Sequence, residues 1–236
     1  MAQTVTVRSS VEAQQAAPLR AVFDRLLAAY GPQHWWPGDS PFEVIVGAIL
    51  TQQTAWANVE KALANLMSAG VFSPDGIRAT SEGELASLIR PSGFYRGKAR
   101  KLKALIALLD ERFGCDLDSL LAAPGDELRS AFLATHGIGP ETADSILLFA
   151  AGRPYFVIDA YTRRIFSRLG LTPAADTYDA WQRLFTRELS PDAALFNEYH
   201  ALIVEHATRT CRPAPLCAQC VLLDICPAGL ACRCLP

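Results

Sequence analysis

The sequence predicts an all-α protein, and three features support that prediction. Apolar residues recur at helical spacing along most of the 236 residues, and capping and turn signals separate the periodic runs. The one strand-like run, 155–158, is too short to found a sheet. Because the connections between periodic runs are short, the helices are expected to pack against one another in bundles.

Composition and charge narrow the class of protein. Half of the residues are apolar, which is ample for one large core or two small ones. The 22 basic and 24 acidic residues nearly balance, so any surface that binds nucleic acid has to be a local patch. The N-terminus has no apolar signal region, and no apolar run approaches the roughly 18 residues that span a bilayer. We therefore expect a cytoplasmic protein whose cysteines stay reduced.

Helices are expected in order along the chain. Residues 1–16 are small and polar and are expected to fray, and the first amphipathic helix starts at Pro18 and closes at Gly31. The next run, 41–52, reads as a buried helix that continues into the following segment. The later periodic segments are 85–90, 98–114, 127–135, 160–170, 177–189 and 193–209.

The stretch from Thr135 to Ile165 organises the chain. Gly137 and Gly139 flank the apolar Ile138, and a proline suits the first position of the helix that follows. Such a glycine turn between helices directs backbone N–H groups outward, where they can hold a DNA phosphate without a basic side chain. An ordinary helix–helix turn is the competing interpretation.

Asp159 lies 20 residues after Gly139, at the start of another helix. Aspartate is a favoured N-cap, so a capping role is the simplest interpretation. The functional interpretation is a carboxylate that faces a flipped nucleotide, stabilises positive charge on its sugar and orients water. Both roles are compatible, because a cap holds the side chain in one direction.

These segments resemble a known family. THGIGPETADSILLFAAGRPYFVIDAYTRRI, TQQTAW, PSGFYRGKA and a C-terminal cysteine run are similar to the endonuclease III superfamily of DNA glycosylases, over roughly residues 18–226. The resemblance implies a two-lobed helix-hairpin-helix fold with a C-terminal iron–sulfur loop. One lobe would span 38–152 and end in the hairpin, the other would combine 1–37 with 153–236, and damaged double-stranded DNA would cross between them. A monomer is expected, since no long apolar seam is left over.

One position departs from the family pattern. Bifunctional members have a lysine where this chain has Glu141. That lysine amine attacks the sugar and forms a Schiff base, which glutamate cannot do. The resemblance therefore implies a monofunctional glycosylase, which releases a base without cutting the strand.

An aromatic loop indicates the substrate. Trp36 and Pro37, together with Trp56 beyond TQQT, resemble the 3-methyladenine glycosylase branch, in which aromatic and proline side chains hold the flipped base. An alkylated purine is cationic, and an aromatic face attracts a cation by about 0.5–2 kcal/mol. The alternative is that these tryptophans are ordinary core residues.

Three further residues match family positions that touch DNA. The resemblance implies that Gln52 fills the gap left by the extruded nucleotide and that Phe94 enters the opposite stack as an apolar wedge. Either side chain could instead be an ordinary surface residue. In the basic cluster that follows, 96–103, Lys98 is the residue expected to contact a phosphate.

The tail predicts a metal group. Cys211, Cys217, Cys220 and Cys226 are spaced C-x5-C-x2-C-x5-C. Zinc sites usually have two close pairs, whereas one C-x2-C with outlying partners suits a 4Fe–4S cluster. The family pattern usually has six residues in the first gap and this chain has five, so zinc and no metal remain alternatives. Two more cysteines, Cys232 and Cys234, lie beyond the pattern.

The sequence thus predicts a base excision repair glycosylase, cytoplasmic and associated with the nucleoid. It is expected to hydrolyse the N-glycosidic bond of an alkylated purine such as 3-methyladenine. Three alternatives stay open: a glycosylase for oxidised pyrimidines or other lesions, an iron–sulfur DNA-binding protein without catalysis, and a zinc-stapled architectural protein.

Overall fold

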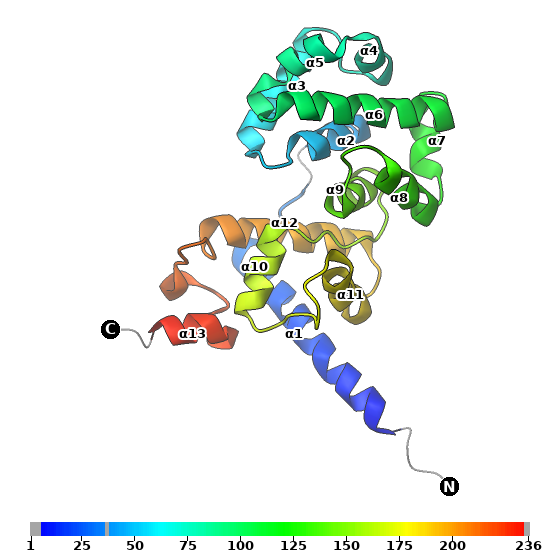
Figure 1. The fold of residues 1–236 in the computed structure, drawn as a ribbon. Helices are drawn as coiled ribbons and strands as arrows, with labels where there is room; N and C mark the ends of the chain where they lie inside the picture. The colour runs from blue at the N-terminus through cyan, green and yellow to red at the C-terminus, as the bar shows by residue number, and fades with distance from the viewer. Residues whose placement is uncertain (1–5, 36–37, 234–236) are drawn as a thin grey trace. The chain divides into compact units, whose positions relative to one another are not determined.

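A computed structural model describes residues 6–35 and 38–233, and the side chains of 18–35 and 38–231. Every regular element in these ranges is a helix, so the all-α prediction is confirmed (Figure 1). None of these helices is long and apolar enough to cross a membrane. The chain folds as two compact units, one within 36–155 and the other from the segments on either side of it.

The unit within 36–155 is built from consecutive short helices. They are α2 (Pro41–Leu50), α3 (Trp56–Ser68), α4 (Pro74–Ala79), α5 (Glu82–Leu88), the 3-10 turn Arg90–Ser92, α6 (Tyr95–Phe113), α7 (Leu117–Ala122), α8 (Gly125–Ala134) and α9 (Pro140–Ser145). After α9 the chain widens into one π-helical turn, Ile146–Ala150. Such turns often occur near functional sites.

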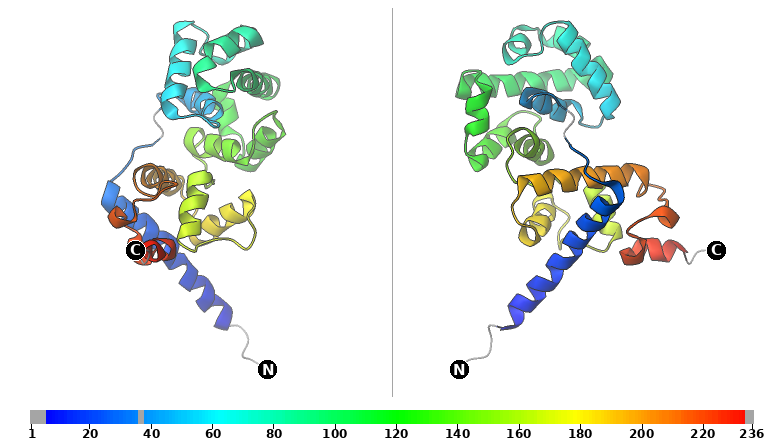
Figure 2. Two further views of the ribbon diagram at one scale, coloured as in Figure 1. Left: turned by 60° about the vertical axis from the view of Figure 1, so that its left-hand side comes forward. Right: turned by 180° about the vertical axis from the view of Figure 1, so that it is seen from behind.

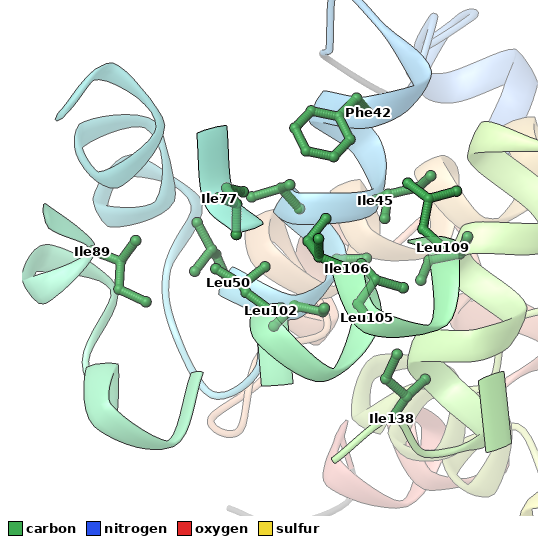
Figure 3. Packing of buried hydrophobic residues seen from close by; sticks show 14 of the residues in the cluster. Phe42, Ile45, Leu50, Ile77, Ile89, Leu102, Leu105, Ile106, Leu109 and Ile138 are labelled. Atoms are coloured by element: carbon green, nitrogen blue, oxygen red, sulfur yellow. The ribbon is translucent and has the colours of Figure 1, made fainter. Parts of the chain in front are cut away.

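The core of this unit forms around α2 and α6 (Figure 3). Eight of the ten residues of α2 are buried, because its apolar residues surround the helix axis instead of forming one stripe. Helix α6 contributes one apolar face, which includes Leu102, Leu105, Ile106 and Leu109. The hairpin residue Ile138 is 4% exposed and belongs to the same core.

The expected continuation of α2 is wrong. The helix ends at Leu50, and α3 starts only at Trp56. Between them Gln53 has a φ of 54°, a left-handed conformation that an α-helix does not accommodate. The loop 51–55 therefore turns the chain where the sequence suggested one long helix.

The second unit contains the two ends of the chain. Its elements are α1 (Thr6–Tyr30), α10 (Ala160–Arg168), α11 (Tyr178–Glu188), α12 (Ala193–Arg209), the 3-10 turns Cys217–Gln219 and Leu223–Ile225, and α13 (Pro227–Arg233). The start expected at Pro18 is wrong, because α1 already begins at Thr6 and Pro18 lies inside it. Helix α12 packs against α1, which crosses it at an angle in the view from behind (Figure 2).

Aromatic rings fill the core of the second unit. Phe156 stacks on Phe185 with ring centroids 4.0 Å apart and meets Phe196 edge-on at 5.2 Å. Tyr199 is fully buried, and its hydroxyl donates to the backbone carbonyl of Leu19 at 2.7 Å. This core anchors the extended segment that starts at Phe156 and leads to the N-terminus of α10.

Candidate nucleic-acid interface and cysteine cavity

The glycine turn joins α8 to α9. Gly137 has a φ of +77°, a left-handed conformation that favours glycine, and a Cβ at this position would overlap the Lys101 side chain. Gly139 is the N-cap of α9 and Pro140 its first residue, as the sequence predicts. Because Ile138 is buried, the backbone of the turn is anchored from within, and the two glycines leave it uncovered by side chains of their own.

A buried ion pair stabilises the helices of this turn. Arg129 of α8 donates to both carboxylate oxygens of Asp144 in α9, from Nε at 2.6 Å and from Nη2 at 3.2 Å. Asp144 is fully buried, and the guanidinium lies 5.9 Å from the centroid of the Tyr155 ring. Burial, together with Asp126, raises the pKa of Tyr155 to about 12. This pair is not predictable from the sequence, since charge spacing does not reveal partners on different helices.

Gln52 connects the loop 51–55 to the hairpin. Its side-chain amide donates to the carbonyl of Gly137 at 3.3 Å and to Oγ1 of Thr142 at 2.9 Å. Its side-chain carbonyl accepts a hydrogen bond from Nζ of Lys101. The glutamine is thus held by three groups of the same unit and not freely exposed.

Phe94 is the most exposed large apolar side chain among the described residues, at 71%. It precedes α6 in a left-handed conformation, with a φ of 45°. Backbone strain of this kind in a non-glycine residue points to function. Phe94 and Gln52 line the same depression of about 320 Å³, together with Gln53, Gly97, Lys98 and Lys101.

The prediction that Lys98 contacts a phosphate is wrong for this structure. Lys98 is 2% exposed, and its ammonium donates to three oxygens within the protein. Lys101 and Lys103 also donate to protein groups, which leaves Arg96 and Arg100 as the exposed cations at the start of α6. The basic cluster therefore divides into inward lysines and outward arginines.

Asp159 is the N-cap of α10, which confirms the capping interpretation. Its Oδ1 accepts hydrogen bonds from the backbone N–H of Thr162 at 2.7 Å and from the Thr162 hydroxyl at 2.8 Å. Both of these hydrogen bonds are accepted by Oδ1, and neither is accepted by Oδ2. Burial lowers the pKa of His200, and the nearby charge of Asp159 opposes that shift.

The aromatic loop is described only in part, because Trp36 and Pro37 lie outside the described residues. Trp56 is half-buried against the core at the start of α3, and its indole N–H donates to Oε1 of Glu60 at 3.0 Å. This placement packs one part of the Trp56 ring against the core and keeps another part accessible.

The four predicted metal-ligating cysteines line one cavity of about 180 Å³. Among the described residues, no three cysteine, histidine or carboxylate side chains meet closely enough to hold a single metal ion. The sulfurs are instead distributed around the cavity wall, which Arg168, Pro215 and Leu223 also line.

Polar groups that can form hydrogen bonds lie beside three of these sulfurs. Nη1 of Arg168 lies 3.2 Å from Sγ of Cys211, and the backbone N–H of Gly229 lies 3.3 Å from Sγ of Cys226. Nε2 of His206 lies 3.7 Å from Sγ of Cys220. Burial first, and then the other three cysteines, raise the pKa of Cys220.

Arg168 also organises the backbone around the cavity. Its guanidinium donates to the carbonyls of Arg212 at 2.7 Å and Pro213 at 2.8 Å. Arg164, one turn earlier, donates to the carbonyl of Cys211 at 2.9 Å. Neither arginine was predicted to lie at this site. The i, i+4 spacing of Arg164 and Arg168 on α10 is the one feature of the sequence that places them on the same helix face.

Comparison with known proteins gives consistent results. Residues 46–191 match the HhH-GPD superfamily of base excision DNA repair proteins. A Methanocaldococcus jannaschii protein named as a DNA repair glycosylase is 43% identical over 87% of this chain and 94% of its own.

Two solved structures extend the likeness to the fold. The H. pylori 3-methyladenine DNA glycosylase MagIII, bound to 1,N6-ethenoadenine, is 28% identical, with a TM-score of 0.70 over 83% of this chain and 97% of its own. Endonuclease III in a non-covalent complex with DNA is 24% identical, with a TM-score of 0.80 over 92% of this chain and 98% of its own.

Proposed function

The chain belongs to the HhH-GPD superfamily of base excision DNA repair proteins and is a DNA glycosylase, and from this premise we propose that it is monofunctional and releases an alkylated purine. The observation that carries the proposal is Glu141. It occupies the first turn of α9, directly after the hairpin, where bifunctional relatives have a lysine. A carboxylate cannot form a Schiff base with the sugar, so the strand stays intact.

The choice of base rests on charge. An alkylated purine carries a positive charge, which attracts it to an aromatic face and makes it a good leaving group. Trp56 supplies such a face, and Trp36 and Pro37 are proposed to complete the base pocket. The likeness to the 3-methyladenine glycosylase MagIII supports this substrate class.

Asp159 is proposed as the catalytic carboxylate. The glycosidic bond breaks, its electron pair leaves with the base, and the cationic base departs neutral. The sugar is left as an oxocarbenium ion, which the aspartate charge stabilises. Water then attacks C1′ and gives up a proton, for which Asp159 is the acceptor. Oδ1 is engaged by Thr162, so Oδ2 is the oxygen proposed to face the sugar and the water.

Duplex DNA is the proposed partner, and a monomer is the proposed state. The backbone amides of Gly137 and Gly139 are proposed to hold a phosphate. Gln52 and Phe94 are proposed to enter the duplex where the damaged nucleotide has left. Their shared depression supports this role, because it brings one polar and one apolar side chain to the same place.

The cysteine cavity is proposed to hold a 4Fe–4S cluster through Cys211, Cys217, Cys220 and Cys226. The residues fit such a group, because four thiols share one apolar cavity, N–H groups point at two of the sulfurs, and Nε2 of His206 lies beside a third. The cluster would supply a covalent cross-link that orders the tail. Arg168 orients the surrounding carbonyls, whatever group the thiols bind.

The test is base release from methylated duplex DNA, with strand breaks measured before and after hot alkali. Breaks that appear only after alkali would support a monofunctional glycosylase for cationic bases. Breaks without alkali would mean that a lyase nucleophile acts in place of Glu141. Release of oxidised pyrimidines alone would move the substrate to that class, and no release from any lesion would favour a binding protein without catalysis.

A further inference from the structure

Among the side chains that the structure describes, Lys98 is the largest buried charged one whose role the proposed mechanism leaves open. Its Nζ donates to the backbone carbonyl of Leu50 at 2.8 Å, to Oγ1 of Thr54 at 2.7 Å and to the backbone carbonyl of Ser92 at 2.6 Å. An ammonium has three N–H groups, so these three contacts use all of its donors.

The three acceptors belong to two different loops. Leu50 ends α2, where helix carbonyls lack partners within the helix, and Gln52 follows two residues later. Ser92 ends the 3-10 turn, and Phe94 follows two residues later. Thr54 reinforces the junction, since its hydroxyl also pairs with the Ser92 carbonyl.

We propose that Lys98 is a positioning residue that ties the Gln52 loop and the Phe94 loop together at their bases, so that both side chains enter DNA as one preformed edge. The inference rests on the proposed DNA-inserting role of Gln52 and Phe94. It assigns to Lys98 no contact with DNA, only the relative placement of the two loops.

The energetics favour this role over simple packing. Burying an ammonium is costly, and an apolar side chain of the same length would fill the space at lower cost. A buried ammonium is favourable only where its three N–H groups bind several acceptors and so hold them close together. Here those acceptors are two loop carbonyls and a hydroxyl, each close in sequence to an inserting residue.

The same contacts predict a dependence on pH. Burial, and then the charge of Lys101 on the same helix, lower the pKa of Lys98 to about 8. The groups that face the ammonium from α2, from the loop 51–55 and from the 3-10 turn are uncharged oxygens. Lys98 is therefore protonated at neutral pH and loses its charge as pH rises through about 8. The neutral amine has only two N–H groups for three acceptors.

The test replaces Lys98 with methionine, which keeps the length and removes the donors. The probe is a duplex with an abasic-site analogue and 2-aminopurine opposite it, because its fluorescence rises when the base is unstacked. At saturating protein, Lys98→Met is expected to lose most of the rise seen with wild type and to match Phe94→Ala. Affinity should fall on the order of tenfold, as expected for lost charged hydrogen bonds.

Lys103 provides a matched control. It lies on the same helix, and its ammonium donates to the carbonyls of Ile77 at 2.7 Å and Arg78 at 2.8 Å, at the end of α4. Neither of these residues neighbours an inserting side chain. Lys103→Met is therefore expected to keep the wild-type fluorescence rise, even if it lowers stability.

Two further measurements separate positioning from folding. Lys98→Met in a Phe94→Ala background should cause no further loss, and the wild-type signal should decline as pH rises from 7 to above the lysine pKa of about 8. If Lys98→Met fails to fold, the pH profile of the wild-type fluorescence signal still tests whether the charge of Lys98 positions the two loops. A wild-type signal in Lys98→Met, an equal loss in Lys103→Met, or a flat pH profile would each overturn the inference. If Phe94→Ala also left the signal unchanged, the inserting role itself would be wrong, and the inference would fail with it.

Discussion

Two regions of the molecule are stabilised in opposite ways: the edge formed by the Gln52 and Phe94 loops, proposed to enter DNA, and the cavity lined by the four cysteines. At the edge, complementary groups meet, with ammonium and amide donors facing carbonyl and hydroxyl acceptors at 2.6–3.3 Å. Around the cavity, four groups of the same kind face one another, and burial, followed by the charges of the other three cysteines, raises the pKa of Cys220. Complementary groups satisfy each other within the chain at the edge, whereas at the cavity the proposed 4Fe–4S cluster would be the shared partner of the four cysteines.

Loss of one cysteine should have the largest effect and should be confined to the tail. Cys220→Ser removes one ligand of the proposed cluster. It is expected to lower the free energy of unfolding by roughly 5 kcal/mol or more, since structural metal sites contribute on the order of 10 kcal/mol. Iron and sulfide content, thermal unfolding and amide hydrogen exchange would be measured together. Exchange in α2 and α6 should stay as in wild type. Equal loss of protection there would contradict the separation of the two regions.

Asp159→Asn should affect chemistry without affecting the fold. Asparagine caps a helix about as well as aspartate, so α10 should persist. Base release should fall by about 10³-fold, as for removal of a catalytic base. Single-turnover kinetics and binding to duplex with an abasic-site analogue would be compared, and binding should be nearly unchanged. Activity close to wild type would refute the catalytic role.

Asp144→Ala tests how much the buried Arg129–Asp144 ion pair between α8 and α9 contributes to the stability of the hairpin. The change leaves Arg129 without its buried partner and should destabilise the protein by about 3 kcal/mol in urea unfolding. The matched control is Asp24→Ala, which breaks the exposed Arg20–Asp24 pair at an expected cost of about 0.5 kcal/mol. Similar costs for both variants would mean that burial of the pair is unimportant.

Gly137→Ala should lower stability by about 1–2 kcal/mol, because alanine is strained at a φ of +77°. It should also displace Lys101 and so loosen Gln52, which weakens DNA binding. Gly139→Ala is the matched control. Its φ is −92°, and a Cβ there would meet open space. Equal effects of the two variants on melting temperature and DNA affinity would contradict this account.

Local signals allowed part of this structure to be predicted. The helical class, the apolar face of α6, the proline start of α9 and the Asp159 cap follow from spacing and capping chemistry within a few residues. These features depend on short-range geometry. A single sequence contains that information directly.

Features that depend on tertiary contacts were missed. The break at 51–55 was hidden because a fully buried segment shows no amphipathic stripe. Lys98 was expected at the surface because lysine is usually exposed, although it lies four residues before Leu102 on the buried face of α6. The ends of the Arg129–Asp144 pair are on different helices, and no spacing rule connects them.

The two hydrogen bonds between Asp159 and Thr162 couple the carboxylate to the state of helix α10. If the first turn of α10 opens, Oδ1 loses both donors and the side chain regains its rotational freedom. Local opening of this kind requires less free energy than global unfolding. With Asp159 in its proposed catalytic role, the protein should on heating lose activity before it loses its overall helical signal, and activity would then report the opening of a single helical turn.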